Sequence, residues 1–98
     1  MHQREERQTI KMKLYHTEVL NMTISNIYEA GDDKAEIKRL LSKLVNHYLE
    51  DTVTPRERQI QAQLLFIDLS TSLADDKARQ TACREILKNI LLVVLIPK

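Results

Sequence analysis

The amino-acid sequence predicts an all-α protein, an antiparallel up-down four-helix bundle, from three observations. Apolar residues recur at helical spacing in four consecutive stretches, at about residues 8–30, 34–50, 55–73 and 76–95. The connections between these stretches are only a few residues long, and short connections reverse the chain so that sequential helices pack antiparallel. With one glycine and two prolines, the chain also has too few turn residues for a sandwich or barrel of short strands.

The first predicted helix ends at Gly31, which is the only glycine in the chain. Its apolar stripe places Leu20, Ile24 and Ile27 at positions i, i+4 and i+7. A glycine directly after the last periodic residue is typical of a helix cap, because a residue without a Cβ adopts left-handed backbone at the least cost. The chain is therefore expected to turn at Gly31 and to begin a second helix at once.

The second predicted helix has the most regular apolar pattern of the sequence. Asp33 precedes it and Glu36 follows three residues later, which is the spacing of a capping box. Its apolar residues keep to one face of a helix, and that face is expected to lie in the core. They are Ile37, Leu40, Leu41, Leu44, Val45, Tyr48 and Leu49.

The third predicted helix has an equally clear start. Thr54 can accept a hydrogen bond from an exposed amide, Pro55 suits the first helical position, and Glu57 completes a capping box. The apolar residues of this helix cover a wide arc. That breadth predicts contact with two neighbouring helices at once.

The fourth predicted helix follows Asp75 and Asp76, which are candidate N-caps, and Pro97 is expected to end it. Cys83 lies among its apolar positions, where a lone cysteine usually behaves as a small buried hydrophobe. Because Cys83 is the only cysteine, the chain can form no internal disulfide and no cysteine-rich zinc site.

Length and charge limit the class of protein. The 98 residues suffice for one domain, expected to span residues 1–98. The 15 Lys and Arg against 14 Asp and Glu leave a net charge of +1, which gives no long-range field to attract nucleic acid or an anionic membrane. Residues 1–8 are polar where a secretory signal would be apolar, so the expected location is the cytoplasm.

No residue pattern indicates catalysis or a cofactor. His2, His16 and His47 do not form a metal-binding motif, and His47 is interpreted as a surface residue beside the stripe of the second helix. The hydroxyls of residues 70–72 are expected to bond to backbone carbonyls rather than to act as nucleophiles. We therefore expect a protein that is not an enzyme and has no catalytic residue, metal, cofactor or small-molecule substrate.

The apolar run of residues 90–96 is the feature that most needs an explanation. Seven consecutive apolar residues point in every direction around a helix, so one buried face cannot cover them, and the run is too short to cross a membrane. Either its last turn is buried in the bundle or against a second copy of the chain, or it is a docking surface for a membrane-embedded or apolar partner. The candidate partner-binding residues are Lys88, Ile90, Leu91, Leu92, Val93, Val94, Leu95 and Ile96.

An alternative function is that of a small regulator binding DNA or a protein through the third and fourth helices, which a short break separates as in a helix-turn-helix. Acidic residues near the fourth helix dilute its positive charge, whereas a nucleic-acid reader normally clusters positive charge along one face. Nucleic acid is therefore the less favoured partner. The residues available for such recognition are Lys77, Arg79, Gln80, Arg84 and Lys88.

The layout resembles the immunity proteins for pediocin-like (class IIa) bacteriocins, the enterocin A immunity family of Gram-positive bacteria. Residues 24–30, Ile-Ser-Asn-Ile-Tyr-Glu-Ala, are similar to the apolar-rich first helix that ends in a tyrosine motif. Residues 36–49 are similar to the leucine-rich second helix. The resemblance covers about residues 17–92.

The resemblance implies a cytoplasmic antiparallel four-helix bundle that protects its producer cell from a pore-forming peptide. It implies one partner, the membrane sugar-transport permease with bound bacteriocin, contacted at the inner face of the membrane, and it implies no catalytic residue. The carboxyl-terminal half would select the bacteriocin, which assigns recognition to the fourth helix and residues 90–96. Family members commonly end in a longer, more polar tail, and this chain departs from them by ending in Ile96, Pro97 and Lys98.

Overall fold

The computed structural model describes the backbone of residues 2–95 and the side chains of residues 16–95. This described part consists of four α-helices with short connections and contains no β-strand. The helices are α1 (His2–Ala30), α2 (Lys34–Leu49), α3 (Pro55–Ser72) and α4 (Lys77–Leu95). The predicted all-α class is thereby confirmed.

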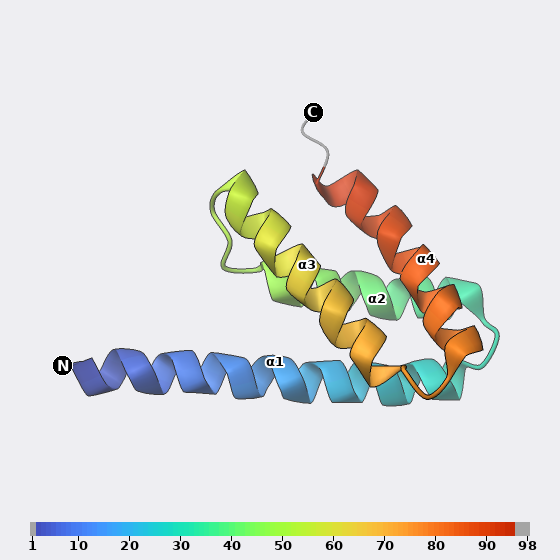
Figure 1. Cartoon of the computed structure of the whole chain (residues 1–98), viewed down its shortest axis with the longest axis horizontal. Helices are drawn as coiled ribbons and strands as arrows, with labels where there is room; N and C mark the ends of the chain where they lie inside the picture. The colour runs from blue at the N-terminus through green and yellow to red at the C-terminus, as the bar shows by residue number, and fades with distance from the viewer. Residues whose placement is uncertain (1, 96–98) are drawn as a thin grey trace.

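The helices form two antiparallel pairs, with α2 at the centre of the fold (Figure 1). α1 and α2 run side by side in opposite directions, and α3 and α4 form a second pair that crosses over α2. Among the described residues, α2 contacts α1, α3 and α4, whereas the main contacts of α1 are with α2. In a simple up-down bundle the first and fourth helices would lie along each other and close a ring. The up-down arrangement is therefore not confirmed.

Three of the helices begin and end within one residue of their predicted bounds. α1 is the exception, because it begins at His2 and not at about residue 8. Residues 2–8 have no apolar stripe, but they consist mostly of Gln, Glu and Arg, which have high intrinsic helix propensity. Apolar periodicity shows where a helix is buried, so it gives no signal for a polar helix start.

Caps at three of the predicted positions satisfy backbone groups at the helix ends. Gly31 has a φ of 62°, in the left-handed region that glycine adopts most easily. Asp33 Oδ1 accepts the N–H of Glu36 at 3.1 Å. Asp76 Oδ1 accepts the N–H of Arg79, also at 3.1 Å. Each carboxylate binds an amide that has no carbonyl partner within its own helix, so the predicted helix starts are confirmed.

The start of α3 is stabilised by two side chains. Thr54 Oγ1 accepts the N–H of Glu57 at 3.1 Å, as predicted. Glu57 Oε2 accepts the N–H of Val53 at 2.9 Å, one residue before the N-cap, so the second bond of the capping box is shifted by one position. Pro55 occupies the first turn of the helix, where an N–H would have no partner.

Replacing Thr54 by alanine is expected to lower the free energy of unfolding by about 1 kcal/mol, because the amide of Glu57 then loses its acceptor. Urea denaturation followed by circular dichroism measures this change. Thr81→Ala is the matched control, since Thr81 is an exposed threonine within α4. Equal stability of the two variants would show that the Thr54 hydroxyl does not stabilise the helix start.

The buried side chains form one apolar core, to which all four helices contribute. The hydroxyl of Thr23, which is buried at the edge of this core, donates to the carbonyl of Val19 at 2.7 Å. Cys83 is fully buried, as predicted. The core residues are Leu20, Ile27, Ile37, Leu40, Leu41, Leu44, Val45, Tyr48, Ala62, Leu65, Leu69, Leu73, Cys83, Leu87, Ile90 and Leu91.

α3 has apolar side chains on two opposite faces. Leu65 and Leu69 are fully buried. In contrast, Ile60, Leu64 and Ile67 are 47%, 45% and 59% exposed. With 3.6 residues per turn, this second set lies about half a turn away from the buried one. α3 does contact two neighbours, α2 and α4, as its wide apolar arc predicted, but it uses one face for both contacts.

Candidate partner-binding surface

The apolar run at the end of α4 divides between the core and the surface. Ile90 and Leu91 are buried in the core, whereas Leu92 and Val93 are 52% and 77% exposed. Val94 is also exposed. The division follows from helical geometry, because three consecutive residues cover most of the circumference of a helix and the core lies on one side.

The other candidate residues lie around this exposed end. Lys88 is exposed one turn before Leu92, and Leu95 is partly buried against the core. Ile96 lies outside the described residues. The exposed candidates are therefore Lys88 and the three residues that follow Leu91.

A groove of about 380 Å³ lies between α2 and α4, and two of these exposed residues, Val93 and Val94, line it. The buried side chains of Val45 and Ile90 form its apolar base, and the side chains of Lys38 and two asparagines at its edges can donate hydrogen bonds. A concave apolar site with a few polar groups suits an apolar side chain of a partner. The groove is lined by Lys38, Ser42, Val45, Asn46, Asn89, Ile90, Val93 and Val94.

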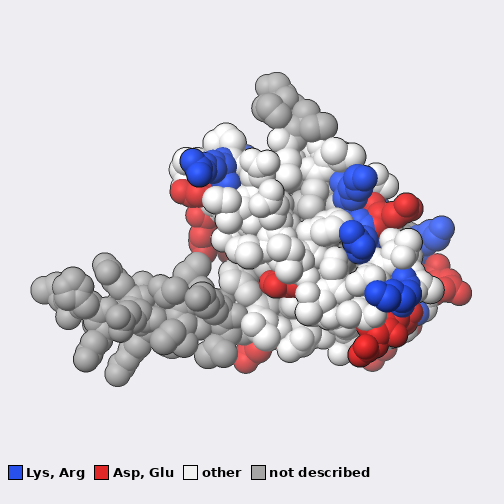
Figure 2. All heavy atoms as spheres, in the orientation of Figure 1, with Lys and Arg blue, Asp and Glu red and all other residues white. Residues whose placement is uncertain are grey.

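We call this groove, together with exposed Lys88 and Leu92, the C-terminal surface. At 100° per residue, Lys88 and Leu92 lie on the side of α4 that faces away from the groove. Figure 2 shows Lys and Arg side chains along α4, which carries Lys88, and few charged side chains over α3. The C-terminal surface thus combines apolar side chains with two cations, Lys38 at the edge of the groove and Lys88 on the opposite side of α4. Such a combination fits a partner that presents apolar anchors next to acidic groups.

Three of the five residues that could read DNA make contacts within the protein. Arg79 donates to two backbone carbonyls at the end of α1. Gln80 Nε2 donates to the carbonyl of Ser70 at 2.7 Å. The guanidinium of Arg84 lies 5.1 Å from the ring centroid of Phe66. These contacts reduce the number of groups on α4 that can turn toward phosphates, which weakens the DNA-binding alternative.

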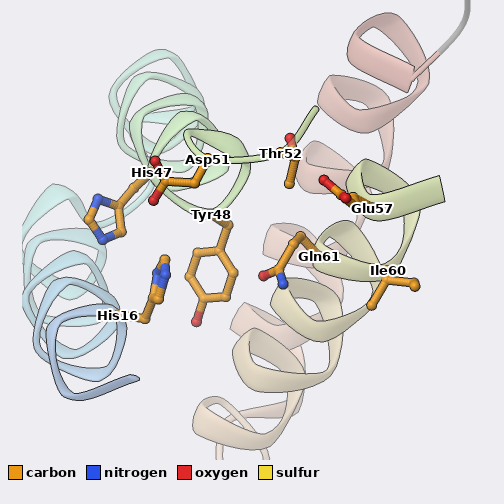
Figure 3. A pocket seen from close by; sticks show the side chains of 8 residues that line it. All are labelled: His16, His47, Tyr48, Asp51, Thr52, Glu57, Ile60 and Gln61. Carbon is orange, nitrogen blue, oxygen red and sulfur yellow. The ribbon is translucent and has the colours of Figure 1, made fainter. Parts of the chain in front are cut away.

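A second pocket, of about 220 Å³, lies where α1, α2 and α3 meet (Figure 3). His16 of α1 and His47 of α2 contact each other edge to face, with ring centroids 4.7 Å apart. The His16 ring also lies 4.8 Å from that of Tyr48, and the Tyr48 hydroxyl donates to Asp68 Oδ2 at 2.9 Å.

The interpretation of His47 as a surface residue was wrong. Its side chain is only 13% exposed, because α1 packs against this end of α2.

The surroundings of this pocket favour uncharged forms of two of its side chains. Burial lowers the pKa of His16, and the charge that His47 carries when protonated lowers it further, although three nearby carboxylates oppose this effect. Burial and the hydrogen bond to Asp68 raise the pKa of Tyr48. His16 and Tyr48 are therefore both neutral at pH 7, and the contact between α1 and α2 includes no buried charge from either ring.

Stability is expected to decrease as the pH falls below 6.5, the ordinary pKa of histidine. Because the pKa of His16 is lowered in the folded state, the unfolded chain binds a proton more readily, so stability rises with pH between the folded pKa and 6.5. The stability due to neutral His16 is complete above this window and is lost as the pH falls through it.

Urea denaturation of the protein and of His16→Gln at several pH values between about 5 and 7.5 tests this expectation, since most carboxylates remain ionised in that range. The variant should have a shallower dependence of stability on pH. An identical slope for both proteins would show that other groups cause the dependence.

The described residues contain neither a cluster of metal ligands nor a helix that could cross a membrane. Within the described residues, no three His, Cys, Asp or Glu side chains are grouped so that they could hold a metal ion. In the same part of the chain, none of the helices combines enough length with enough apolar character to span a bilayer.

The Ser70 hydroxyl is buried and has no hydrogen-bond partner among the described groups, so its predicted bond to a carbonyl is not found.

Comparison of the chain with protein-family models, with curated proteins and with solved structures found no match. The fold and the surface define a small all-helical domain with a closed core and an exposed apolar end next to a groove.

Proposed function

We propose that the protein is a non-enzymatic interaction protein that binds a partner protein through the C-terminal surface. The observation that supports this proposal is the exposure of Val93 and Val94 at an apolar groove, and of Leu92 on the same turn of α4, while the two preceding residues are buried. Contiguous exposed apolar side chains next to a concavity are typical of protein interaction sites.

The energy available at this surface is sufficient for specific binding. Full burial of a Leu or Val side chain contributes about 1.5–3 kcal/mol. Leu92 and Val93 can bury about half or more of their areas against a partner, and the groove can accept an apolar anchor in return. Lys38 adds an exposed cation at the edge of the groove, which influences partner choice and association rate more than affinity.

Within this class, we propose that the protein confers immunity to a pore-forming class IIa bacteriocin by binding the sugar-transport permease to which the bacteriocin is bound. This step rests on the resemblance at residues 24–30 and 36–49 and on the number and order of the helices. The protein would act in the cytoplasm, at the inner face of the membrane. The antiparallel up-down bundle implied by the resemblance stays a prediction, which distance measurements between spin labels on α1 and α4 would test.

Expression of the protein in a bacteriocin-sensitive Gram-positive strain tests the proposal. We expect protection against at least one class IIa peptide, and we expect Leu92→Asp with Val93→Asp to reduce that protection by about tenfold or more, because two charges would be buried at the interface. Both side chains are exposed, so the double variant should keep the helicity of the original protein.

The matched control is Thr81→Asp with Ala82→Asp, which adds the same charge at exposed positions of α4 outside the C-terminal surface. This control should protect as well as the original protein. Absence of protection against every class IIa peptide would refute the immunity function. Full protection by Leu92→Asp with Val93→Asp would instead refute the assignment of the C-terminal surface.

A further inference from the structure

The pocket between α1, α2 and α3 is large enough for a small organic molecule. We call it the histidine pocket. Its volume of about 220 Å³ exceeds the roughly 150 Å³ of an apolar cavity that accommodates benzene, so a molecule slightly larger than benzene fits. It shares no lining residue with the C-terminal surface. The residues that line it are His16, His47, Tyr48, Asp51, Thr52, Glu57, Ile60 and Gln61.

The walls of the histidine pocket combine aromatic rings with apolar and uncharged polar groups (Figure 3). The rings of His16 and Tyr48, from α1 and α2, lie 4.8 Å apart. On the α3 side, Ile60 is exposed, so its side chain offers open apolar area to the pocket. The side-chain amide of Gln61 can both donate and accept a hydrogen bond. These walls suit an organic molecule that is partly apolar and partly polar.

Carboxylates give the histidine pocket its negative charge. Asp51, in the connection between α2 and α3, and Glu57, in the first turn of α3, both line it and are both exposed. Neither forms an ion pair with a Lys or Arg of the described part of the chain. Asp68 adds a third carboxylate next to the pocket, where it accepts the hydroxyl of Tyr48. Both Asp51 and Asp68 act electrostatically on His16, so their field reaches the pocket wall.

The described lining residues bring no fixed positive charge into the pocket. None of them is Lys or Arg. Arg56 and Arg58 flank Glu57 in the sequence, but at 100° per residue they point to other sides of α3, and neither lines the pocket. His16 is neutral at pH 7, because burial lowers its pKa. The pocket therefore repels anions and attracts a cation.

An organic cation suits these walls better than a metal ion does. A bound metal needs three or four ligands brought together, and the described residues contain no such group. An ammonium group is instead attracted by carboxylates without a fixed coordination geometry, and the faces of aromatic rings attract it as well. The apolar part of the same molecule can pack against Ile60.

We propose that the histidine pocket binds a small organic cation, a primary amine with a short aromatic or apolar body, as a ligand that is not converted. The ammonium group lies near the carboxylates of Asp51 and Glu57, and the body packs against Ile60 and the aromatic rings. Because the pocket is built from α1, α2 and α3, the ligand binds the folded chain alone and stabilises the packing of these helices.

NMR titration of the whole chain with benzylamine at pH 7 and constant ionic strength tests this proposal. Benzyl alcohol is the neutral probe of nearly the same shape. Benzylamine should bind with a dissociation constant of about 1–10 mM, as expected for so small a ligand. Benzyl alcohol should bind about fivefold more weakly or less tightly still, because it lacks the charge that the carboxylates attract. The chemical-shift changes should centre on His16, Tyr48 and Gln61.

A pair of charge-removing variants tests the position of the cation. Asp51→Asn should raise the dissociation constant of benzylamine about threefold and leave that of benzyl alcohol unchanged. Asp75→Asn is the matched control, because Asp75 is also an exposed aspartate between two helices but does not line the pocket.

Three results would overturn the proposal. The first is equal affinity for the two probes, and the second is an equal loss of affinity in both variants, since either would show that the pocket does not recognise charge. The third is the absence of chemical-shift changes at the histidine pocket up to about 50 mM benzylamine, including changes confined to Val93 and Val94 of the C-terminal surface.

Discussion

Leu65→Ala is expected to lower the free energy of unfolding by about 2–5 kcal/mol, which is a large part of the stability of a domain of this size. The Leu65 side chain is fully buried on the face of α3 that packs against α2 and α4. Its truncation removes three carbon atoms from the core and leaves a cavity that the neighbouring helices can fill only in part.

Leu64→Ala is the matched control for this experiment, because it makes the same chemical change one position earlier in the same helix. Leu64 is 45% exposed and faces away from the core. Its replacement by alanine should change the stability by less than about 1 kcal/mol, since alanine is also the better helix former. Equal destabilisation by the two variants, measured by urea denaturation at low protein concentration, would contradict the assignment of the two faces.

Arg79→Met is expected to lower the free energy of unfolding by about 2 kcal/mol, through the loss of hydrogen bonds from a charged donor. Arg79 Nη1 donates to the carbonyls of Ile27 and Gly31, at 3.3 Å and 3.1 Å. Ile27 lies in the last turn of α1, where backbone acceptors have no partner within the helix, and Gly31 directly follows that helix. The guanidinium also lies 4.8 Å from the ring centroid of Tyr28, so one side chain links the end of α1 to the start of α4.

Arg84→Met is the control for this variant, five residues further along the same helix. Arg84 is exposed, and its guanidinium lies 5.1 Å from the ring centroid of Phe66. An exposed cation–π contact contributes about 0.5–1 kcal/mol, so this variant should be clearly more stable than Arg79→Met. The opposite order, measured by urea denaturation, would show that Arg79 does not hold the two helices together.

The sequence predicted α2 well, because the core surrounds this helix and its apolar stripe has one direction. Six of its seven apolar positions are buried, from Ile37 to Tyr48, and Leu49 is partly buried against the core. The caps at Gly31, Asp33 and Thr54 were predictable for a different reason. They depend on local backbone geometry, which residue type largely decides.

The two faces of α3 could not be assigned from the sequence. Apolar residues on opposite sides of a helix give no preferred direction, so the pattern cannot show which side meets the core. The positions of the neighbouring helices decide that Leu65 is buried and Leu64 is exposed. The crossing of the two helix pairs has the same origin, because it depends on how side chains of separate helices interlock.

The candidate sites were predictable only in part. The apolar run of residues 90–96 showed that a single face could not bury all seven side chains, and exposed Leu92 and Val93 agree with that reasoning. The sequence did not show that Ile90 would help to form the base of a groove with α2. It also gave no signal for the contact of His16 with His47, which joins residues of two helices through tertiary packing.

Methyl relaxation in the presence of a soluble paramagnetic probe measures directly which apolar side chains are buried in the core and which are exposed. The exposed ones lie at the C-terminal surface and on the outer face of α3. The protein concentration is kept low enough for the chain to be monomeric. The methyl groups of Leu64, Ile67 and Leu92 should relax strongly. Those of Leu65, Leu69 and Leu91 should be protected, because these side chains are buried. Similar relaxation of both sets, or protection of Leu64 and exposure of Leu65, would contradict the arrangement of the helices.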